Sequence, residues 1–227
     1  MELLFTLAQP TLPIEGDVRR FPVHRIYCVG RNFAEHAREM GASIERGQPV
    51  FFMKPADAIV TEGEPVPYPP ATIDLHHEVE LVVALGRDAD GIITTADADA
   101  LVFGYAIGLD LTRRDLQARA KAKSLPWDTA KGFDASAPIS RIIPGGYPRH
   151  ERLWLEVNGT LRQQGALTDL VFSVPEVIHE LSKLYRLRAG DLIFMGTPAG
   201  VAALQPGDSF RAGIDGRIEF RGRIEAN

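Results

Sequence analysis

Cysteine is almost absent from this chain, which has 227 residues and a single cysteine, Cys28. One thiol cannot form an internal disulfide, and we therefore expect a reducing, cytoplasmic environment. Long apolar runs are lacking too, because no stretch approaches the roughly 20 apolar residues that a membrane-spanning helix needs. The N-terminus also lacks the charged-then-apolar order of a secretory signal. We expect a protein without a membrane partner.

Positive charge is not in excess. Lys and Arg total 25 against 30 Asp and Glu, which leaves a net charge of −5 at pH 7. Proteins that bind nucleic acid usually carry a basic surface, so a nucleic-acid partner is not expected. With 45% hydrophobic residues, the chain can bury a substantial core. Many short apolar runs, punctuated by 21 Gly and 16 Pro, predict a mixed, β-rich α+β fold with few helices.

The stretch over residues 74–85, DLHHEVELVVAL, is the one around which the rest is organised. Its alternation and the apolar run that follows predict one strand. Side chains of a strand alternate between faces, so Glu78 and Glu80 share a face. Two carboxylates on an otherwise apolar strand are costly to bury unless they are paired or bind a cation. Taken alone, such a pair is more often a solvated strand face.

A second buried strand is predicted over residues 101–110, and it ends in the carboxylate of Asp110. Asp110 is then well placed to join Glu78 and Glu80. Three carboxylates form an all-oxygen site for a hard cation such as Mg²⁺, Mn²⁺ or Ca²⁺. Zinc is disfavoured, because no cysteine and histidine spacing accompanies them. We therefore predict that Glu78, Glu80 and Asp110 hold a metal ion.

A short helix is predicted in the segment GRNFAEHAREM, with Asn32 as its N-cap. On that helix His36 and Glu39 lie three residues apart and share a face. A carboxylate beside an imidazole fixes its tautomer and raises its basicity, so this pair can act as a general base that activates water. The alternative is an ordinary charge pair on a surface helix.

Two lysines follow apolar or helical segments. Lys54 comes after an apolar run, at the mouth of the core, and its alternative is a side chain that extends to solvent. Lys131, in DTAKGFD, can offset negative charge that develops near the metal, and a surface lysine is its alternative. Between them, residues 112–123 have helix-forming composition, with Thr112 and Asp115 as a variant capping box.

Several motifs occur in one order along the chain: GRNFAEHAREM, FFMKPAD, HHEVEL, GLDLTRRDLQ, LPWDTAKGFDASAP and LIFMGTPAGV. Together they resemble the fumarylacetoacetate hydrolase family, and within it the short members that hydrolyse acylpyruvates. The resemblance covers nearly the whole chain from residue 25 to about residue 208. It implies a β-sandwich roll with few helices, a homodimer, and Mg²⁺ or Mn²⁺ bound by Glu78, Glu80 and Asp110.

The resemblance also places His36 and Glu39 as the water-activating pair and Lys131 as the residue that steadies an enolate. Relatives that isomerise or decarboxylate related keto acids often lack the His/Glu helix, so its presence favours hydrolysis. The expected reaction cleaves a C–C bond of an acylpyruvate, with fumarylpyruvate yielding fumarate and pyruvate, as in gentisate-type aromatic degradation. As a hypothesis, the substrate, a small 2-oxo acid, is bound by Arg31, Lys54, Arg114, Gln117 and Thr197, with arginine suited to bidentate contacts.

Two alternatives stay open. One is a sister enzyme that decarboxylates oxaloacetate or interconverts keto and enol forms, which needs the metal and Lys131 but no attack by water. The other is a non-catalytic β protein that binds a keto acid. The two classes differ in whether any turnover occurs.

The remaining segments fit one catalytic domain over residues 25–227, preceded by an N-terminal edge segment over residues 1–24. Hairpins are predicted at the NG pair of residues 158–159 and the DG pair of residues 215–216. The clearest helix spans residues 173–185 and begins with a capping box.

Overall fold

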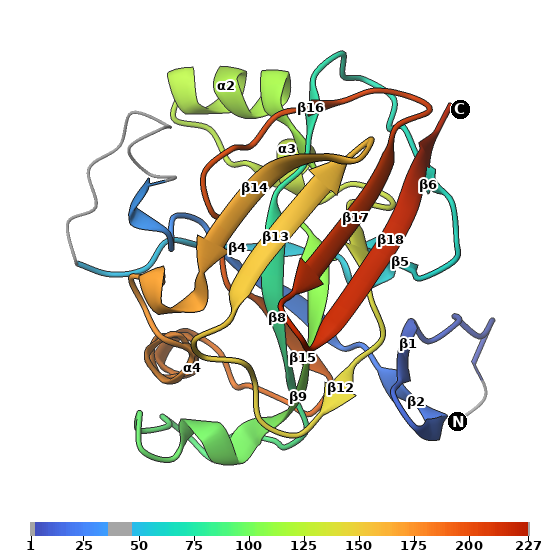
Figure 1. Ribbon diagram of the computed structural model, residues 1–227. Coiled ribbons are helices and arrows are strands. Elements are labelled where there is room, and N and C mark those ends of the chain that lie inside the picture. Colours follow the sequence, from blue (N-terminus) through green and yellow to red (C-terminus); the bar gives the residue numbers. More distant parts are fainter. Residues whose placement is uncertain (1–2, 36–46, 227) are drawn as a thin grey trace.

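The computed structural model describes residues 3–35 and 47–226. Its centre is a strongly curved sheet built from β3 (Arg25–Val29), β4 (Phe51–Lys54), β5 (Ile59–Thr61), β8 (Val79–Leu85), β9 (Val102–Leu109), β11 (Ala137–Ile139), β12 (Ile143–Pro144) and β15 (Asp191–Phe194) (Figure 1). The strand order is β4-β3-β15-β8-β9-β11-β5, and β12 pairs with β9. The predicted carboxylates lie on or directly beside β8 and β9, which are antiparallel neighbours in the middle of the sheet.

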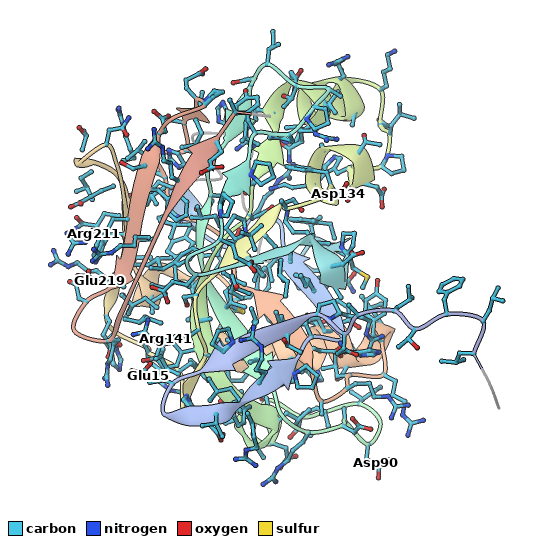
Figure 2. The ribbon with its side chains drawn as sticks, turned by 90° about the vertical axis from the view of Figure 1, so that its right-hand side faces the viewer. Glu15, Asp90, Asp134, Arg141, Arg211 and Glu219 are labelled. Atoms are coloured by element: carbon cyan, nitrogen blue, oxygen red, sulfur yellow. The ribbon has the colours of Figure 1, made fainter. Side chains whose placement is uncertain are left out.

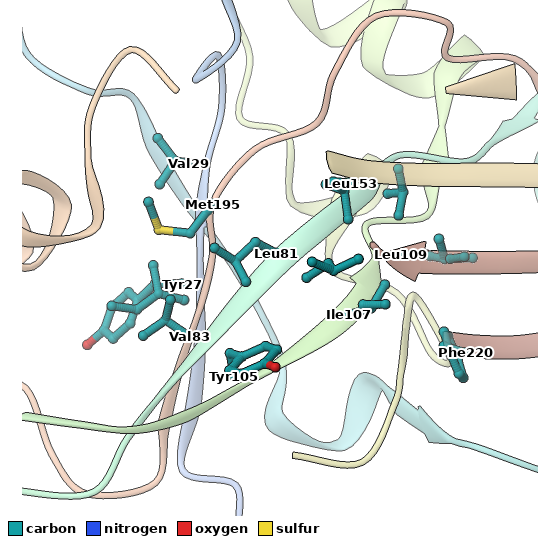
Figure 3. Close-up of a cluster of buried hydrophobic side chains, with 14 of the residues drawn as sticks. Tyr27, Val29, Leu81, Val83, Tyr105, Ile107, Leu109, Leu153, Met195 and Phe220 are labelled. Atoms are coloured by element: carbon teal, nitrogen blue, oxygen red, sulfur yellow. The ribbon is translucent and has the colours of Figure 1, made fainter. Parts of the chain in front are cut away.

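A second sheet lies across one face of the first. It consists of β6 (Val66–Pro67), β13 (Arg152–Val157), β14 (Thr160–Ala166), β17 (Ser209–Ile214) and β18 (Ile218–Glu225), in the order β14-β13-β17-β18-β6. Leu81 and Ile107 of the first sheet meet Leu153 and Phe220 of the second in one hydrophobic core (Figure 3). The predicted NG hairpin joins β13 to β14, with positive φ at both turn residues. The β-rich sandwich roll predicted from the sequence is confirmed.

The N-terminal segment packs on the opposite face of the central sheet. Strands β1 (Thr11–Ile14) and β2 (Asp17–Pro22) form a separate hairpin. Leu12 and Phe21 from this hairpin join a second apolar cluster with Cys28 and Phe194. Burial raises the pKa of the Cys28 thiol well above its usual value, so Cys28 is a neutral core residue.

The strand predicted over residues 74–85 is broken in two. Its first part is β7 (Leu75–His76), which joins β10 (Thr112–Arg113) and β16 (Ala203–Leu204) in a small sheet of order β10-β7-β16. The chain leaves this sheet at His77, whose backbone N–H donates to the carbonyl of Ala202, and enters the central sheet as β8. The break places Glu78 at the joint between the two sheets.

Helices lie at the periphery of the fold. They include α2 (Arg114–Ala122), α3 (Asp128–Lys131) and α4 (Val174–Leu184), with short 3-10 helices at Ala56–Ala58, Ala98–Leu101 and Leu167–Asp169, and residues 34–35 are helical as well. The capping box of α4, formed by Ser173 and Glu176, is confirmed. No helix within the described ranges is long and apolar enough to cross a membrane.

Two predicted helix caps are wrong. The hydroxyl of Thr112 donates to the Asp110 carbonyl and accepts from Lys131, and it does not cap α2. The Asn32 amide donates to the carbonyls of Phe172 and Met195, at 2.9 and 2.8 Å, and accepts from the Phe172 N–H. Both side chains make long-range contacts near the site, where a buried polar group needs partners more than a helix end does.

The outer surface carries exposed ion pairs, among them Arg211 with Glu219 and Arg141 with Glu15 (Figure 2). Exposed pairs of this kind contribute little to stability. The three carboxylates predicted to bind a metal are buried instead.

Candidate active site

The predicted site residues meet in one pocket at the edge of the central sheet. Its lining consists of Val29, Gly30, Arg31, Phe52, Glu78, Glu80, Asp110, Arg114, Gln117, Lys121, Trp127, Lys131 and Thr197. Every sequence-predicted site residue that the structure describes is among them, with one exception, Lys54. His36 and Glu39 lie outside the described residues, so the predicted general base stays a prediction.

The three predicted metal ligands converge. One carboxylate oxygen from each of Glu78, Glu80 and Asp110 lies within 4.8 Å of the others, and all three side chains are buried. The strand ends are locked together, because the Asp110 N–H donates to the Glu78 carbonyl at 2.8 Å. The pairing of β8 with β9 therefore fixes the spacing of the carboxylates before any ion binds.

Of the three carboxylates, Glu80 has the fewest positively charged partners to offset its negative charge. Burial raises the pKa of Glu80 well above its usual value, and the neighbouring charges of Asp110 and Glu78 raise it further. Its Oε2 accepts the Gly196 N–H at 2.6 Å, but no lysine or arginine in the described part of the chain forms an ion pair with it. A buried, all-oxygen donor set in which one carboxylate has no ion pair among the described residues fits Mg²⁺ or Mn²⁺.

Lys131 lies among the carboxylates. Its Nζ donates to Glu78 Oε2 at 2.8 Å, to Asp110 Oδ2 at 2.6 Å and to Thr112 Oγ1 at 2.7 Å. Burial opposes its charge, yet the carboxylates of Asp110 and Glu78 outweigh that effect and raise the pKa of Lys131. The side chain is therefore a fixed, desolvated ammonium at the floor of the pocket.

Lys54 occupies a different place from the one predicted. Its side chain is completely buried and does not line the pocket. Its Nζ lies 2.8 Å from Asp110 Oδ1 and donates to the backbone carbonyls of Leu111 and Lys131. The structure thus places Lys54 against Asp110, as a residue that orients a carboxylate, because an ammonium so deeply buried needs a permanent counter-charge.

Arg114 and Gln117 are held together at the start of α2. Arg114 donates to Glu78 Oε1 at 2.6 Å and to Gln117 Oε1 at 2.7 Å. Since Gln117 accepts through its oxygen, its amide N–H groups are left to donate to a ligand. Arg31, which also lines the pocket, has φ +143°, a backbone conformation that costs a non-glycine residue about 1–3 kcal/mol.

Sequence reasoning missed Lys121. It lies on α2 at the pocket wall, and its Nζ is 5.2 Å from the centre of the Trp127 ring. Partial burial, together with the charges of Arg114 and Arg31, lowers the pKa of Lys121. The signal was present in the sequence, because spacings of three and four residues place Arg114, Gln117 and Lys121 on one face of a helix.

Known proteins of similar sequence show the family to which the chain belongs. Residues 25–225 match the family described as fumarylacetoacetate (FAA) hydrolase C-terminal. The chain belongs to this family. It is 46% identical over 203 residues to a mitochondrial oxaloacetate tautomerase of Rattus norvegicus, covering 88% of this chain and 91% of the relative. The family's members are enzymes with several activities, so membership fixes the chemistry more closely than the substrate.

Solved structures give a second comparison. The fumarylpyruvate hydrolase of Pseudomonas aeruginosa, determined with Mn²⁺ and pyruvate, is 44% identical, covers 100% of both chains and has a TM-score of 0.95. A putative fumarylpyruvate hydrolase of Burkholderia cenocepacia is 50% identical, covers 100% of this chain and 99% of its own, and has a TM-score of 0.92. This chain of the FAA hydrolase family therefore shares its complete fold with these structures.

Proposed function

We propose that this protein holds Mg²⁺ or Mn²⁺ on Glu78, Glu80 and Asp110 and interconverts the keto and enol forms of oxaloacetate. The observation that carries the proposal is the ammonium of Lys131, buried in contact with two of the three carboxylates. The similarity to the rat tautomerase supports the choice of reaction.

The residues of the pocket have different roles in this proposal. When bound, the metal ion would supply a Lewis acid for the carboxylate and keto oxygens of the 2-oxo acid. Lys131 supplies a preorganised positive charge that favours an enolate over the ketone, because the enolate carries more negative charge. Arg114, Gln117 and Thr197 supply hydrogen-bond donors for carboxylate oxygens.

The charge balance favours a substrate with two carboxylates. The three site carboxylates are matched by three cations, Lys54, Lys131 and Arg114, so their charges sum to −3 + 3 = 0 when all are ionised. A bound divalent cation would add a charge of +2, which a substrate with two carboxylates would neutralise. Lys121, which forms no ion pair in the described part of the chain, offers a contact for the distal carboxylate.

Hydrolysis of an acylpyruvate such as fumarylpyruvate is the second candidate. It is supported by the neighbour with Mn²⁺ and pyruvate, at 44% identity over the full chain, and by the pair His36 and Glu39 in the sequence. This reaction needs the same enolate stabilisation, because pyruvate leaves as its enolate, and it adds a base that activates water. The predicted homodimer and cytoplasmic location stay predictions.

The two reactions can be separated in one series of assays. Enol-to-keto conversion of oxaloacetate and loss of fumarylpyruvate are each followed by ultraviolet absorbance, with Mn²⁺, after chelation, and with Mn²⁺ but no protein. We expect metal-dependent acceleration of oxaloacetate conversion that survives His36→Ala. Loss of that acceleration in His36→Ala, together with fast fumarylpyruvate cleavage by the wild type, would favour the hydrolase. No metal-dependent turnover of either compound would overturn both proposals.

A further inference from the structure

A buried amide lies directly behind the pocket. Gln163, on β14, is 1% exposed. Its Oε1 accepts the Val79 N–H at 3.1 Å and lies 2.8 Å from His77 Nδ1. Its Nε2 donates to Thr197 Oγ1 at 2.7 Å and to the Pro198 carbonyl at 2.8 Å. All hydrogen-bonding positions of this amide are thus used by groups at the back of the site.

The orientation of the Gln163 amide is settled by its two backbone partners. The Val79 N–H can only donate, so the atom facing it must be the amide oxygen. The Pro198 carbonyl can only accept, so the atom facing it must be the amide nitrogen. A flipped amide would leave two buried backbone groups without partners, at a cost of about 1–3 kcal/mol each.

This orientation determines the role of the Thr197 hydroxyl. Because Gln163 Nε2 donates to Thr197 Oγ1, that oxygen is an acceptor toward the back of the site. Its own hydrogen must point elsewhere, and Thr197 lines the pocket. The described part of the chain shows no hydrogen bond in which the Thr197 hydroxyl is the donor. The hydroxyl is therefore left as a donor to whatever occupies the pocket.

The backbone around Gln163 is shaped to hold this contact. β14 has an irregular register opposite Leu155 and Glu156, and Gln163 is buried there although the three residues of β14 before it are exposed. The loop that carries Thr197 crosses β14 at Gly200, which has φ +97° and whose position leaves no space for a Cβ against the Arg162 carbonyl. Glycine is required there, and it allows the loop to approach the strand closely.

We propose that Gln163 is a positioning residue that commits the Thr197 hydroxyl to donate to an anionic oxygen of the substrate. The inference rests on the proposed binding of a 2-oxo acid in this pocket, but not on which reaction follows. Gln163 touches no ligand itself. Its effect passes through Thr197, so it should vanish when the Thr197 hydroxyl is removed.

The test is a double-mutant cycle with oxalate, a planar dicarboxylate that resembles the metal-chelating end of a 2-oxo acid. Oxalate binding to the Mn²⁺-loaded protein is measured by calorimetry for wild type, Gln163→Glu, Thr197→Val and the double variant. Gln163→Glu keeps the shape but replaces the donor by a carboxyl group, which can take the Thr197 hydrogen. We expect about a tenfold weaker affinity, or roughly 1.4 kcal/mol, for Gln163→Glu. In the Thr197→Val background the same change should alter affinity less than twofold.

Gln163→Met provides a second variant of similar length without a carboxyl group, for the case in which Gln163→Glu does not fold. With Thr197 free to rotate, we expect about a threefold loss of oxalate affinity, again absent in the Thr197→Val background. Equal losses in both backgrounds would overturn the positioning role and leave a structural one. Undiminished affinity in both Gln163 variants would overturn it as well.

Turnover separates this inference from the proposed function. If oxalate coupling is present but oxaloacetate and fumarylpyruvate are both inert, the reaction is wrong and the role of Gln163 stands. If either compound turns over but the coupling is absent, only the role of Gln163 fails. Failure of the Mn²⁺-loaded wild type to bind oxalate would overturn both.

Discussion

The pocket has two unlike walls. The acidic wall, Glu78, Glu80 and Asp110, is buried, and its spacing is fixed by backbone pairing of strands in the middle of the central sheet. The basic wall, Arg31 and Lys121, is exposed and lies on a loop and on α2. Within the acidic wall each contact between charges is short and dry, whereas the basic wall is open to solvent and to salt.

The contrast separates chemistry from selectivity. Groups that stabilise a developing charge work best when they are rigid and desolvated, which describes the acidic wall and Lys131. Groups that recognise the far end of a substrate can be solvated, since each contributes only a modest gain in affinity. We therefore expect changes in the acidic wall to affect folding, metal binding and rate, and changes in the basic wall to affect KM.

The largest effect is expected from Lys54→Met. The change removes the counter-charge from buried Asp110 Oδ1, and breaking a buried ion pair costs about 3–5 kcal/mol. We expect the free energy of unfolding of the metal-free protein to fall by about that amount in urea denaturation, and by less with Mn²⁺ bound. The exposed Lys123→Met is the matched control and should change stability by less than about 0.5 kcal/mol. A stable Lys54→Met protein with a raised KM would restore Lys54 as a substrate contact.

Lys131→Met should reduce kcat by about 100- to 1,000-fold, the usual loss when one preorganised donor is removed from a developing anion. KM should change much less, and steady-state kinetics at saturating Mn²⁺ measure kcat and KM separately. Wild-type turnover in a folded Lys131→Met protein would contradict the role given to this ammonium.

Metal binding should stabilise the protein. At about 100 times its dissociation constant, Mn²⁺ is expected to raise the free energy of unfolding by about 2.7 kcal/mol through mass action. Glu80→Gln keeps the shape of the ligand and removes its charge, and the gain should then require a much higher Mn²⁺ concentration. Thermal unfolding across a Mn²⁺ titration measures both. If Glu80→Gln gave the same titration curve as the wild type, Glu80 would not be a metal ligand.

The smallest effect is expected from the basic wall. Lys121→Ala should raise KM for a dicarboxylic 2-oxo acid by about three- to tenfold, with kcat nearly unchanged, and the difference should shrink at high ionic strength. Steady-state kinetics at low and high salt, with Lys123→Ala as the control, tests this. A loss that is the same for a monocarboxylic 2-oxo acid would show that Lys121 does not read the distal carboxylate.

The sequence predicts the three carboxylates of the acidic wall, but it does not predict the role of Gln163 behind the pocket. Strand alternation brings Glu78 and Glu80 to one side, and Asp110 follows a buried run, so local pattern is sufficient for the ligand set. The capping box of α4 is likewise a local signal, and it is confirmed. Gln163 has no such signal, because a glutamine in a polar strand looks the same whether its side chain faces water or a buried loop.

The failed predictions share a cause. The strand over residues 74–85 is divided because β7 pairs with β10 and β16 whereas β8 pairs with β9 and β15, and β16 is far away in the chain. Thr112 leaves its expected cap because Lys131 donates to its hydroxyl. Lys54 follows an apolar run into the core because Asp110 is there to receive it. In each instance a partner distant in sequence outweighs a local preference, and pattern alone does not reveal such partners.

The break between β7 and β8 has a kinetic consequence. Glu78 stands where two sheets join, and its partners Asp110, Arg114 and Lys131 come from later segments of the chain. Contacts so far apart in sequence form late during folding, because the entropy of closing long loops must be met first. We therefore expect the carboxylate cluster to be assembled only when these two sheets have docked. A Mn²⁺ ion bound by these carboxylates would then be held only by molecules in which this joint is folded, so denaturation of the joint would release it.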